Sequence, residues 1–116
     1  MKNSYTGSCH CGKVRFNARL DLQDSMQCDC SICTRKGAIV VKVPEEDFEL
    51  LTDLGDLQLY TFNKHIAKHY FCPVCGVHTF NRPRTTPELW AVNLRCLQDV
   101  DLAGLNPRQV QGSKLD

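Results

Sequence analysis

Long hydrophobic runs are absent from this sequence of 116 residues. The longest aliphatic stretch, Ala38-Ile39-Val40-Val41, is far too short to cross a bilayer. The opening residues, Met1-Lys2-Asn3-Ser4-Tyr5, lack the apolar core of a secretory signal. We therefore expect no membrane partner and a place in the reducing cytoplasm, where cysteines bind metal more often than they form disulfides. Disulfides stay open as the alternative, because some chains are secreted without a leader.

A large excess of charge is also absent. The formal net charge of +1 predicts no strong attraction to nucleic acid or to anionic lipid. Seven thiolates around two divalent ions would bring that charge to about −2, which weakens a nucleic-acid interpretation further. No linker, repeat or low-complexity stretch is present, so residues 1–116 are expected to form a single domain.

Alternating and β-branched segments predict a mainly β chain. Residues 13–20 alternate strictly between apolar and polar side chains, which predicts a strand with one buried face. Residues 37–43 are β-branched and apolar, and Pro44 ends that strand. Further strands are expected at 48–52, 57–62, 66–71, 77–81 and 89–95.

Turn residues suggest how these strands connect. Asp53-Leu54-Gly55-Asp56 predicts a hairpin between 48–52 and 57–62, and Asn63-Lys64 extends it into a meander. Only two short helical segments are expected. One covers residues 31–36, with Ser31 as N-cap and Gly37 as the stop, and the other is a turn or two within 102–109.

The eight cysteines fall into three groups and a singleton. The groups are Cys9-His10-Cys11, Cys28-Asp29-Cys30-Ser31-Ile32-Cys33 and Cys72-Pro73-Val74-Cys75-Gly76, and Cys96 stands alone. A Cys-x-x-Cys-Gly turn is a recurrent zinc knuckle, since glycine permits its tight return. In extended chain a Cys-x-Cys pair turns both sulfurs to one side.

Ligand number divides these groups between two Zn²⁺ ions per chain. A structural zinc takes four ligands, whereas a catalytic zinc keeps three and an open position. The first and third groups together supply a closed site, Cys9, Cys11, Cys72 and Cys75, and the middle group supplies Cys28, Cys30 and Cys33. Two alternatives stay open: a single site with reduced thiols beside it, or a three-cysteine site closed by Asp29, a histidine or Cys96.

A zinc ion with three thiolates and an open position suits the capture of an external thiol. Three anionic sulfurs make the ion a weak Lewis acid, so a soft sulfur ligand fits it better than water activation does. The three-cysteine group is therefore the candidate catalytic site.

The three cysteine motifs, in this order and at these distances, resemble the family of glutathione-dependent formaldehyde-activating enzymes. The first motif extends over Gly7-Ser8-Cys9-His10-Cys11-Gly12-Lys13-Val14-Arg15-Phe16, and the third includes Phe71. Within the family the branch of centromere protein V is most similar, through Tyr60-Thr61-Phe62-Asn63, Ala67-Lys68-His69 and Cys96-Leu97. The resemblance covers about 5–101, which we take as the core of the domain.

This resemblance implies a β-tent type fold, in which a closed zinc site pins two small antiparallel sheets. By the same resemblance, Cys9, Cys11, Cys72 and Cys75 match the structural ligands, and Cys28, Cys30 and Cys33 match those of the active-site zinc. It implies a carbon–sulfur lyase or synthase whose small-molecule partner is glutathione or its hydroxymethyl adduct.

Three departures from the family pattern affect the site. Asp29 stands where many members carry His or Asn, and it adds negative charge or accepts a hydrogen bond there. Thr34 follows the third cysteine, so a basic anchor for a substrate carboxylate is displaced to Arg35 and Lys36. The segment Gln111-Gly112-Ser113-Lys114 leads to no aromatic residue.

The remaining candidates have structural interpretations. His65 and His69 are expected to be half-exposed strand residues, His10 to point away from the metal, and His78 to pack. Cys96 is expected to be a buried core thiol. Trp90, Phe80 and Phe71 are expected to build the core between the sheets. Arg82 and Arg84 are expected in a stiff, exposed basic loop able to catch the carboxylates of a peptide thiol.

Two other function classes compete with the enzyme. One is a binding module in which both zinc ions are structural and the surface contacts a protein, as the resemblance to centromere protein V allows. The other is a redox switch that uses Cys28, Cys30 and Cys33 as oxidisable thiols.

Overall fold

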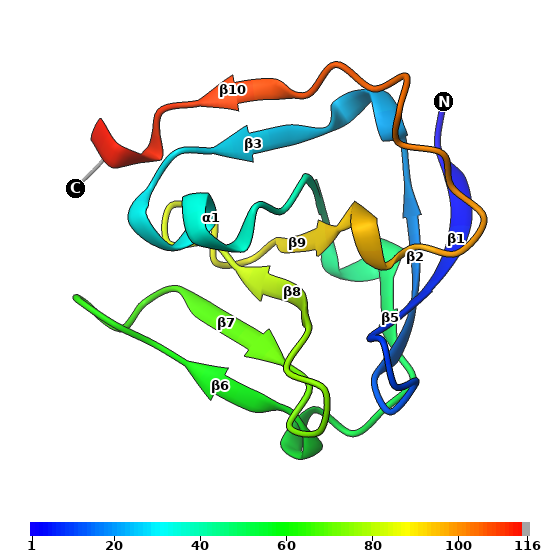
Figure 1. The fold of residues 1–116 in the computed structure, drawn as a ribbon, viewed down its shortest axis with the longest axis horizontal. Coiled ribbons are helices and arrows are strands. Elements are labelled where there is room, and N and C mark those ends of the chain that lie inside the picture. Colours follow the sequence, from blue (N-terminus) through cyan, green and yellow to red (C-terminus); the bar gives the residue numbers. More distant parts are fainter. Residues whose placement is uncertain (115–116) are drawn as a thin grey trace.

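The computed structural model describes residues 1–114, which form ten strands in two sheets (Figure 1). The strands are β1 (Asn3–Ser8), β2 (Arg15–Leu20), β3 (Met26–Cys28), β4 (Val40–Val43), β5 (Phe48–Leu50), β6 (Gln58–Tyr60), β7 (Lys68–Phe71), β8 (His78–Arg82), β9 (Trp90–Asn93) and β10 (Arg108–Val110). The single α-helix of this part of the chain, α1, covers Ser31–Lys36. Short 3-10 turns lie at Leu22–Asp24, Glu45–Asp47, Leu54–Asp56, Leu94–Cys96 and Gly112–Lys114. The prediction of a mainly β fold with two sheets is confirmed.

The smaller sheet has three antiparallel strands in the order β1-β2-β5. Its central strand, β2, buries Phe16, Ala18 and Leu20 and exposes Arg15 and Arg19. The strict alternation of the sequence thus places one face of this sheet against the core.

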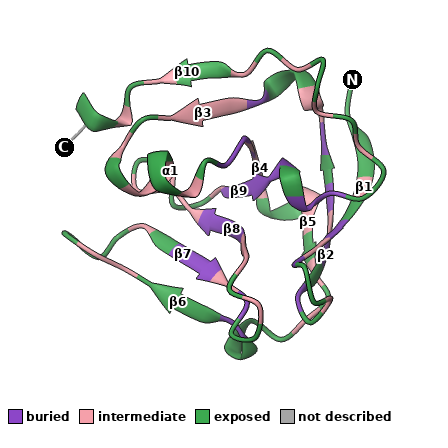
Figure 2. Ribbon diagram, in the orientation of Figure 1, coloured by how far each residue is buried: buried purple, intermediate pink, exposed green. Residues whose placement is uncertain are grey.

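The larger sheet has seven strands in the order β10-β3-β4-β9-β8-β7-β6. Its middle strands β9 and β8 are largely buried, whereas the edge strands β6 and β10 are mostly exposed (Figure 2). All pairs are antiparallel except β10 with β3, which is parallel. This sheet is therefore larger than expected and mixed in direction.

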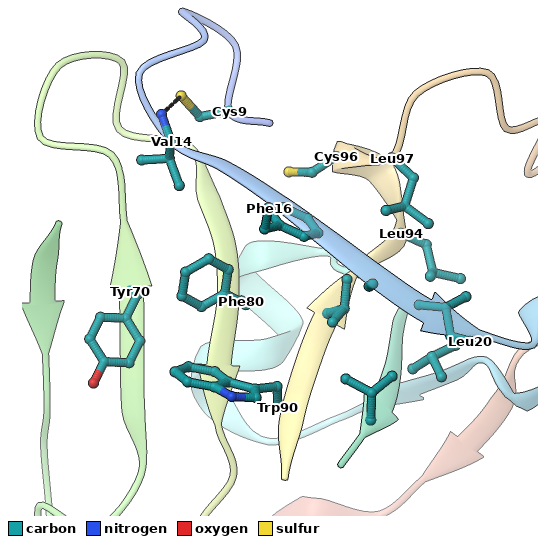
Figure 3. Packing of buried hydrophobic residues seen from close by; sticks show 14 of the residues in the cluster. Cys9, Val14, Phe16, Leu20, Tyr70, Phe80, Trp90, Leu94, Cys96 and Leu97 are labelled. Carbon is teal, nitrogen blue, oxygen red and sulfur yellow. Dashed lines mark hydrogen bonds between the residues drawn. The ribbon is translucent and has the colours of Figure 1, made fainter. Parts of the chain in front are cut away.

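Aromatic side chains from both sheets meet between them and form the core (Figure 3). Phe16 of β2 packs edge-on against Phe80 of β8, with ring centroids 5.8 Å apart. Phe48 of β5 stacks on Trp90 of β9 at 4.8 Å. Burying each such ring contributes roughly 1.5–3 kcal/mol, so these contacts hold the sheets together. Phe71 is only half-buried, and its predicted place in this core is wrong.

The predicted hairpin between 48–52 and 57–62 is also wrong. Residues Phe48–Leu50 pair with β2 in one sheet, and Gln58–Tyr60 pair with β7 in the other. Between them the Asp53 side chain accepts a hydrogen bond from the amide of Gly55 at 3.0 Å, which fixes a 3-10 turn. The turn residues determine this local geometry, but they do not determine which strands pair on either side.

The C-terminal segment differs from the prediction as well. No helix forms within 102–109. A turn closes with the amide of Leu105 donating to Leu102, and the chain then enters β10. Pro107 lacks an N–H and disfavours a helical conformation at Asn106, which explains the extended path. At α1, Cys30 occupies the N-cap instead of Ser31, while Gly37 ends the helix with φ of 63°, as predicted.

None of the helices within residues 1–114 has both the length and the apolar composition needed to cross a bilayer. The eight cysteines, all inside this range, are free thiols, so the disulfide alternative is not what the structure contains.

Candidate metal centres and substrate pocket

Two loops bring four cysteines together at one end of the core. Cys9 and Cys11 lie between β1 and β2, and Cys72 and Cys75 lie between β7 and β8. Their Sγ atoms all lie within 4.8 Å of one another. Cys9 to Cys11 and Cys11 to Cys72 are both 3.6 Å apart.

The two loops have the same local design. In each, the amide of the first cysteine donates to a carbonyl five residues later, Cys9 to Val14 and Cys72 to Val77, both at 3.1 Å. A glycine with positive φ follows the second cysteine, at 84° for Gly12 and 77° for Gly76. These backbone conformations favour glycine, so both tight returns are specified by the sequence.

Backbone amides stabilise several of these sulfurs as thiolates. The exception is Cys11: the amide of Lys13 works to lower its pKa, but burial and hydrogen bonds with the other three thiols outweigh it and raise that pKa to about 11. Val14 donates to Sγ of Cys9 at 3.3 Å (Figure 3), and Val74 donates to Sγ of Cys72 at 3.3 Å. The amide of Cys11, followed by that of Val77, lowers the pKa of Cys75 to about 6. Amide donors and depressed pKa values are what a thiolate ligand needs.

The spacing of these sulfurs fits a zinc ion. Zinc–sulfur bonds of about 2.3 Å in a tetrahedron place the sulfurs about 3.8 Å apart. The observed 3.6 Å separations are close to that value. The loop of Cys9 and Cys11 joins two strands of the small sheet, and the loop of Cys72 and Cys75 joins two strands of the large one. An ion here would therefore link the two sheets.

The other cysteine group lies where β3 turns into α1. Cys28 ends β3, Cys30 is the N-cap of α1, and Cys33 lies within the helix. Their three Sγ atoms again lie within 4.8 Å of one another, and all three residues are half-buried. The structure thus contains the two cysteine groups that the motif spacing predicts, each able to hold a metal ion.

The three thiols differ in acidity. Burial works to raise the pKa of Cys30, but hydrogen bonds from the Cys33 amide and from the neighbouring thiols outweigh it, so that pKa is lowered. Burial raises the pKa of Cys33 to about 12. Binding a metal as three thiolates therefore releases protons, and affinity for the ion will fall in acid.

The C-terminal segment passes directly behind this group. The amide of Asp29 donates to the carbonyl of Val110, and the amide of Ser113 donates to the Asp29 carboxylate, both at 3.0 Å. This contact with Ser113 lowers the pKa of Asp29. Between them, a Cβ on Gly112 would lie 2.3 Å from Sγ of Cys28, so only glycine fits there.

Four candidates for a fourth protein ligand are engaged elsewhere. Within residues 1–114, no histidine, acidic residue or further cysteine joins the three sulfurs within 4.8 Å. Asp29 binds Ser113, and the buried Cys96 donates to the carbonyl of His78 at 3.6 Å. The side chains of His69 and His78 are hydrogen-bonded to Lys36, at 3.1 Å each. An ion held by Cys28, Cys30 and Cys33 would keep one position free of protein.

A pocket borders the three cysteines. Besides these cysteines it is lined by Met26, Ser31, Ile32, Lys36, Ala38, Val40, Lys42, Phe62, Asn63, Lys64, Ile66, Ala67, His69, Asn81, Pro83, Arg84, Thr85, Ala91, Val110 and Gly112. Four of these residues are basic, and none of the described lining residues is acidic. The pocket therefore suits a ligand that carries negative charge.

The predicted anchors lie in different places. Lys36 lines the pocket, but Arg35 is exposed and donates to the carbonyl of Ser31 on its own helix. Arg84 lines the pocket wall. Arg82 is not in an exposed loop: it ends β8, its guanidinium lies 3.5 Å from the centre of the Trp90 ring, and it pairs with Glu45 at 2.8 Å.

Histidine environments also depart from expectation. His69 is buried, with 5% exposure, instead of half-exposed. His10 and His65 are exposed. Cys96 is a buried core thiol, as expected, and burial raises its pKa to about 11.

Sequence reasoning missed Lys42, Lys64 and the role of Gly112. The two lysines have no motif around them, and only the pairing of β4 with β9 and the turn after β6 bring them to the pocket. Gly112 lies in the C-terminal segment that departs from the family pattern. Its contact with Cys28, however, depends on the parallel pairing of β10 with β3.

Comparison with known proteins agrees with this arrangement. The sequence pattern of the glutathione-dependent formaldehyde-activating enzymes matches residues 4–111. The crystal structure of a Rhodobacter sphaeroides protein is similar to this chain, with 35% sequence identity and a TM-score of 0.83. That similarity covers 91% of this chain and 99% of the other.

Proposed function

Because this chain belongs to the family of glutathione-dependent formaldehyde-activating enzymes, we propose that it joins a small thiol such as glutathione to formaldehyde, or splits that adduct, beside Cys28, Cys30 and Cys33. The observation that carries the proposal is the group of three sulfurs without a fourth protein ligand, facing a basic pocket free of described acidic residues. The zinc ion that these cysteines would hold supplies an open position for an external sulfur.

The reaction needs no further reactant. In the forward direction the sulfur adds to the carbonyl carbon of formaldehyde, and the carbon–oxygen double bond becomes a single bond. The proton of the thiol ends on the oxygen, which gives a hydroxymethyl thioether. The reverse reaction breaks the same carbon–sulfur bond, as expected of a carbon–sulfur lyase.

Basic and apolar residues of the pocket would contribute to binding in different ways. Lys36, Lys42, Lys64 and Arg84 offer positive charge to the carboxylates of a peptide thiol. Phe62 and Ile66 add apolar surface to the pocket lining, which helps to exclude water. Lys36 is the anchor that we retain from the sequence, and Arg35 is less well placed for that role.

We also propose membership of the centromere protein V-like branch and a place in the cytoplasm. Phe62, Asn63, Ala67 and His69, which carry the resemblance to that branch, line the pocket. Members of that branch would then differ from the other members of the family in the ligands that the pocket binds. Eight free thiols are compatible with a reducing compartment.

X-ray absorption at the zinc edge tests the proposal directly. Glutathione added to the zinc-loaded chain should raise the mean number of sulfur ligands per zinc from about 3.5 to about 4. S-methylglutathione, which has no free thiol, should leave it unchanged. In an assay of formaldehyde consumption, Cys30→Ala should abolish thiol-dependent turnover, and Cys96→Ala should retain it as the matched control.

If millimolar glutathione left the mean number of sulfur ligands per zinc unchanged and no turnover were found, the enzyme proposal would be contradicted. The chain would then be a binding module with two structural ions.

A further inference from the structure

Lys36, which lines the pocket beside the three cysteines, forms a cluster with two histidines, His69 and His78, to which the proposed chemistry assigns no role. Lys36 ends α1, and its Nζ lies 3.1 Å from Nδ1 of His69 and 3.1 Å from Nε2 of His78. The two imidazole rings come from the paired strands β7 and β8, with centroids 6.4 Å apart. The side chain of Lys36 thus extends from the end of α1 to a position between the two rings.

The chemistry of the lysine fixes the proton positions on both rings. An ammonium group has three donors and no acceptor, so each ring nitrogen that faces it must present a lone pair. The proton of a neutral His69 then lies on Nε2, and that of a neutral His78 on Nδ1. These two atoms are the buried ring nitrogens for which the described residues provide no hydrogen-bond partner.

Both rings are suited to remain neutral. Burial, with the Lys36 charge second, lowers the pKa of His69 to about 4 and that of His78 to about 3. Burial also lowers the pKa of Lys36, while the charges of Cys33, Cys30 and Cys28 oppose that shift. The position of Nζ between two ring nitrogens, 3.1 Å from each, fits a lysine that donates to both rings.

Neighbouring side chains hold the ring of His69 and the main chain at His78 in place. Phe62 stacks on His69 with centroids 5.8 Å apart. The carbonyl of His78 accepts hydrogen bonds from the Asn93 side chain at 2.9 Å and from the Cys96 thiol at 3.6 Å. Two fixed acceptors therefore restrict a side chain that would otherwise have large rotamer freedom.

We infer that His69 and His78 are positioning residues, whose neutral rings hold the Lys36 ammonium as a fixed cation in the wall of the pocket beside the three cysteines. This inference rests on the proposed function, because the cation is useful only if a thiolate binds beside the three cysteines. Three thiolates and a divalent ion carry a net charge of about −1, and an incoming thiolate raises it to about −2. A cation held nearby offsets one of these charges and favours binding of the anionic sulfur.

The tautomers test the inference without any assay of activity. Long-range ¹H–¹⁵N spectra of the zinc-loaded chain near neutral pH should place the proton of His69 on Nε2 and that of His78 on Nδ1. The Nδ1 tautomer is the less favoured one in free histidine, so its presence would report the contact. In Lys36→Met the signal of His78 should move toward the Nε2 tautomer. A wild-type His78 protonated on Nε2, or on both nitrogens, would overturn the inference.

Thiol affinity provides the second measurement. By isothermal titration with glutathione, Lys36→Met and His78→Met should each raise Kd about tenfold. His78→Gln, whose amide can present an acceptor in the place of Nε2, should stay within about twofold of wild type. Each variant is first checked for two zinc ions, and a wild-type Kd in His78→Met would overturn the inference. Failure of the proposed function is distinct, since wild type would then bind no glutathione while the tautomers would still decide the inference.

Discussion

Gly112 occupies a position where the backbone passes behind Cys28 with no room for a side chain. The nearest side-chain atoms to a Cβ at this position are Sγ of Cys28, at 2.3 Å, and Cβ of Cys30, at 3.4 Å. Two hydrogen bonds with Asp29 fix the segment on both sides of Gly112. The Asp29 amide donates to the carbonyl of Val110, and the Ser113 amide donates to the Asp29 carboxylate. The segment cannot move away without breaking them, so a larger residue would displace the cysteine.

Gly112→Ala should therefore reduce the metal content from two ions to about one per chain, with the fold retained. The displaced Sγ of Cys28 leaves two ligands, too few for a stable zinc site. Gly104→Ala is the matched control, because no atom lies within 4 Å of a Cβ there. Metal analysis of both purified proteins checks the prediction, and two ions in Gly112→Ala would contradict it.

The grouping of Cys28, Cys30 and Cys33 follows from the sequence because their spacing is local. Cys28, Cys30 and Cys33 lie within six residues, and the backbone alone brings their sulfurs together. The state of His69 and the contact of Gly112 depend instead on strands paired across the sheet. No local pattern encodes such pairings, so these features came only from the structure.

At the scale of elements, the four-cysteine group joins the β1–β2 turn to the β7–β8 turn. The first belongs to the small sheet and the second to the large one, so the ion would act across the core. The three-cysteine group lies within one stretch, from the end of β3 to α1. Loss of an ion should accordingly have different consequences at the two groups.

Cys72→Ala should prevent stable folding, whereas Cys30→Ala should leave the chain folded. Structural zinc contributes roughly 10 kcal/mol or more of binding free energy, while small domains are stable by about 5–15 kcal/mol. Cys72 is fully buried, so its replacement also leaves a cavity. Circular dichroism and thermal unfolding of both variants measure the difference, and equal destabilisation would refute this division of roles.

The prediction of strands succeeded where the residue pattern of a single strand shows which of its faces is buried. The alternation of residues 13–20 identified β2 and its buried face, because that face packs on the aromatic core. It failed at 48–52 and 57–62, where a true local turn separates strands of different sheets. It also missed β1, β3 and β10. The partner of β10 is β3, which lies about eighty residues earlier in the chain.

At the scale of the whole molecule, the two cysteine groups differ in what surrounds them. In the four-cysteine group Cys9 and Cys72 are buried, with exposures of 3% and 0%, and belong to the hydrophobic core, whereas Cys11 is exposed and Cys75 is half-buried. Cys28, Cys30 and Cys33 are half-buried and border the pocket. A chelator entering the pocket reaches the second group without unfolding the first.

Zinc release to a chromophoric chelator should therefore have two phases of similar amplitude. The fast phase should remove one ion per chain with no change in circular dichroism, because the three-cysteine group lies within one stretch of chain and does not join the two sheets. The slow phase should accompany loss of structure, since it opens the junction between the sheets. Glutathione should slow the fast phase alone, because a ligand that completes the coordination stabilises the bound ion by mass action. Release of both ions in a single phase would mean that the two groups do not divide into a structural and an accessible site.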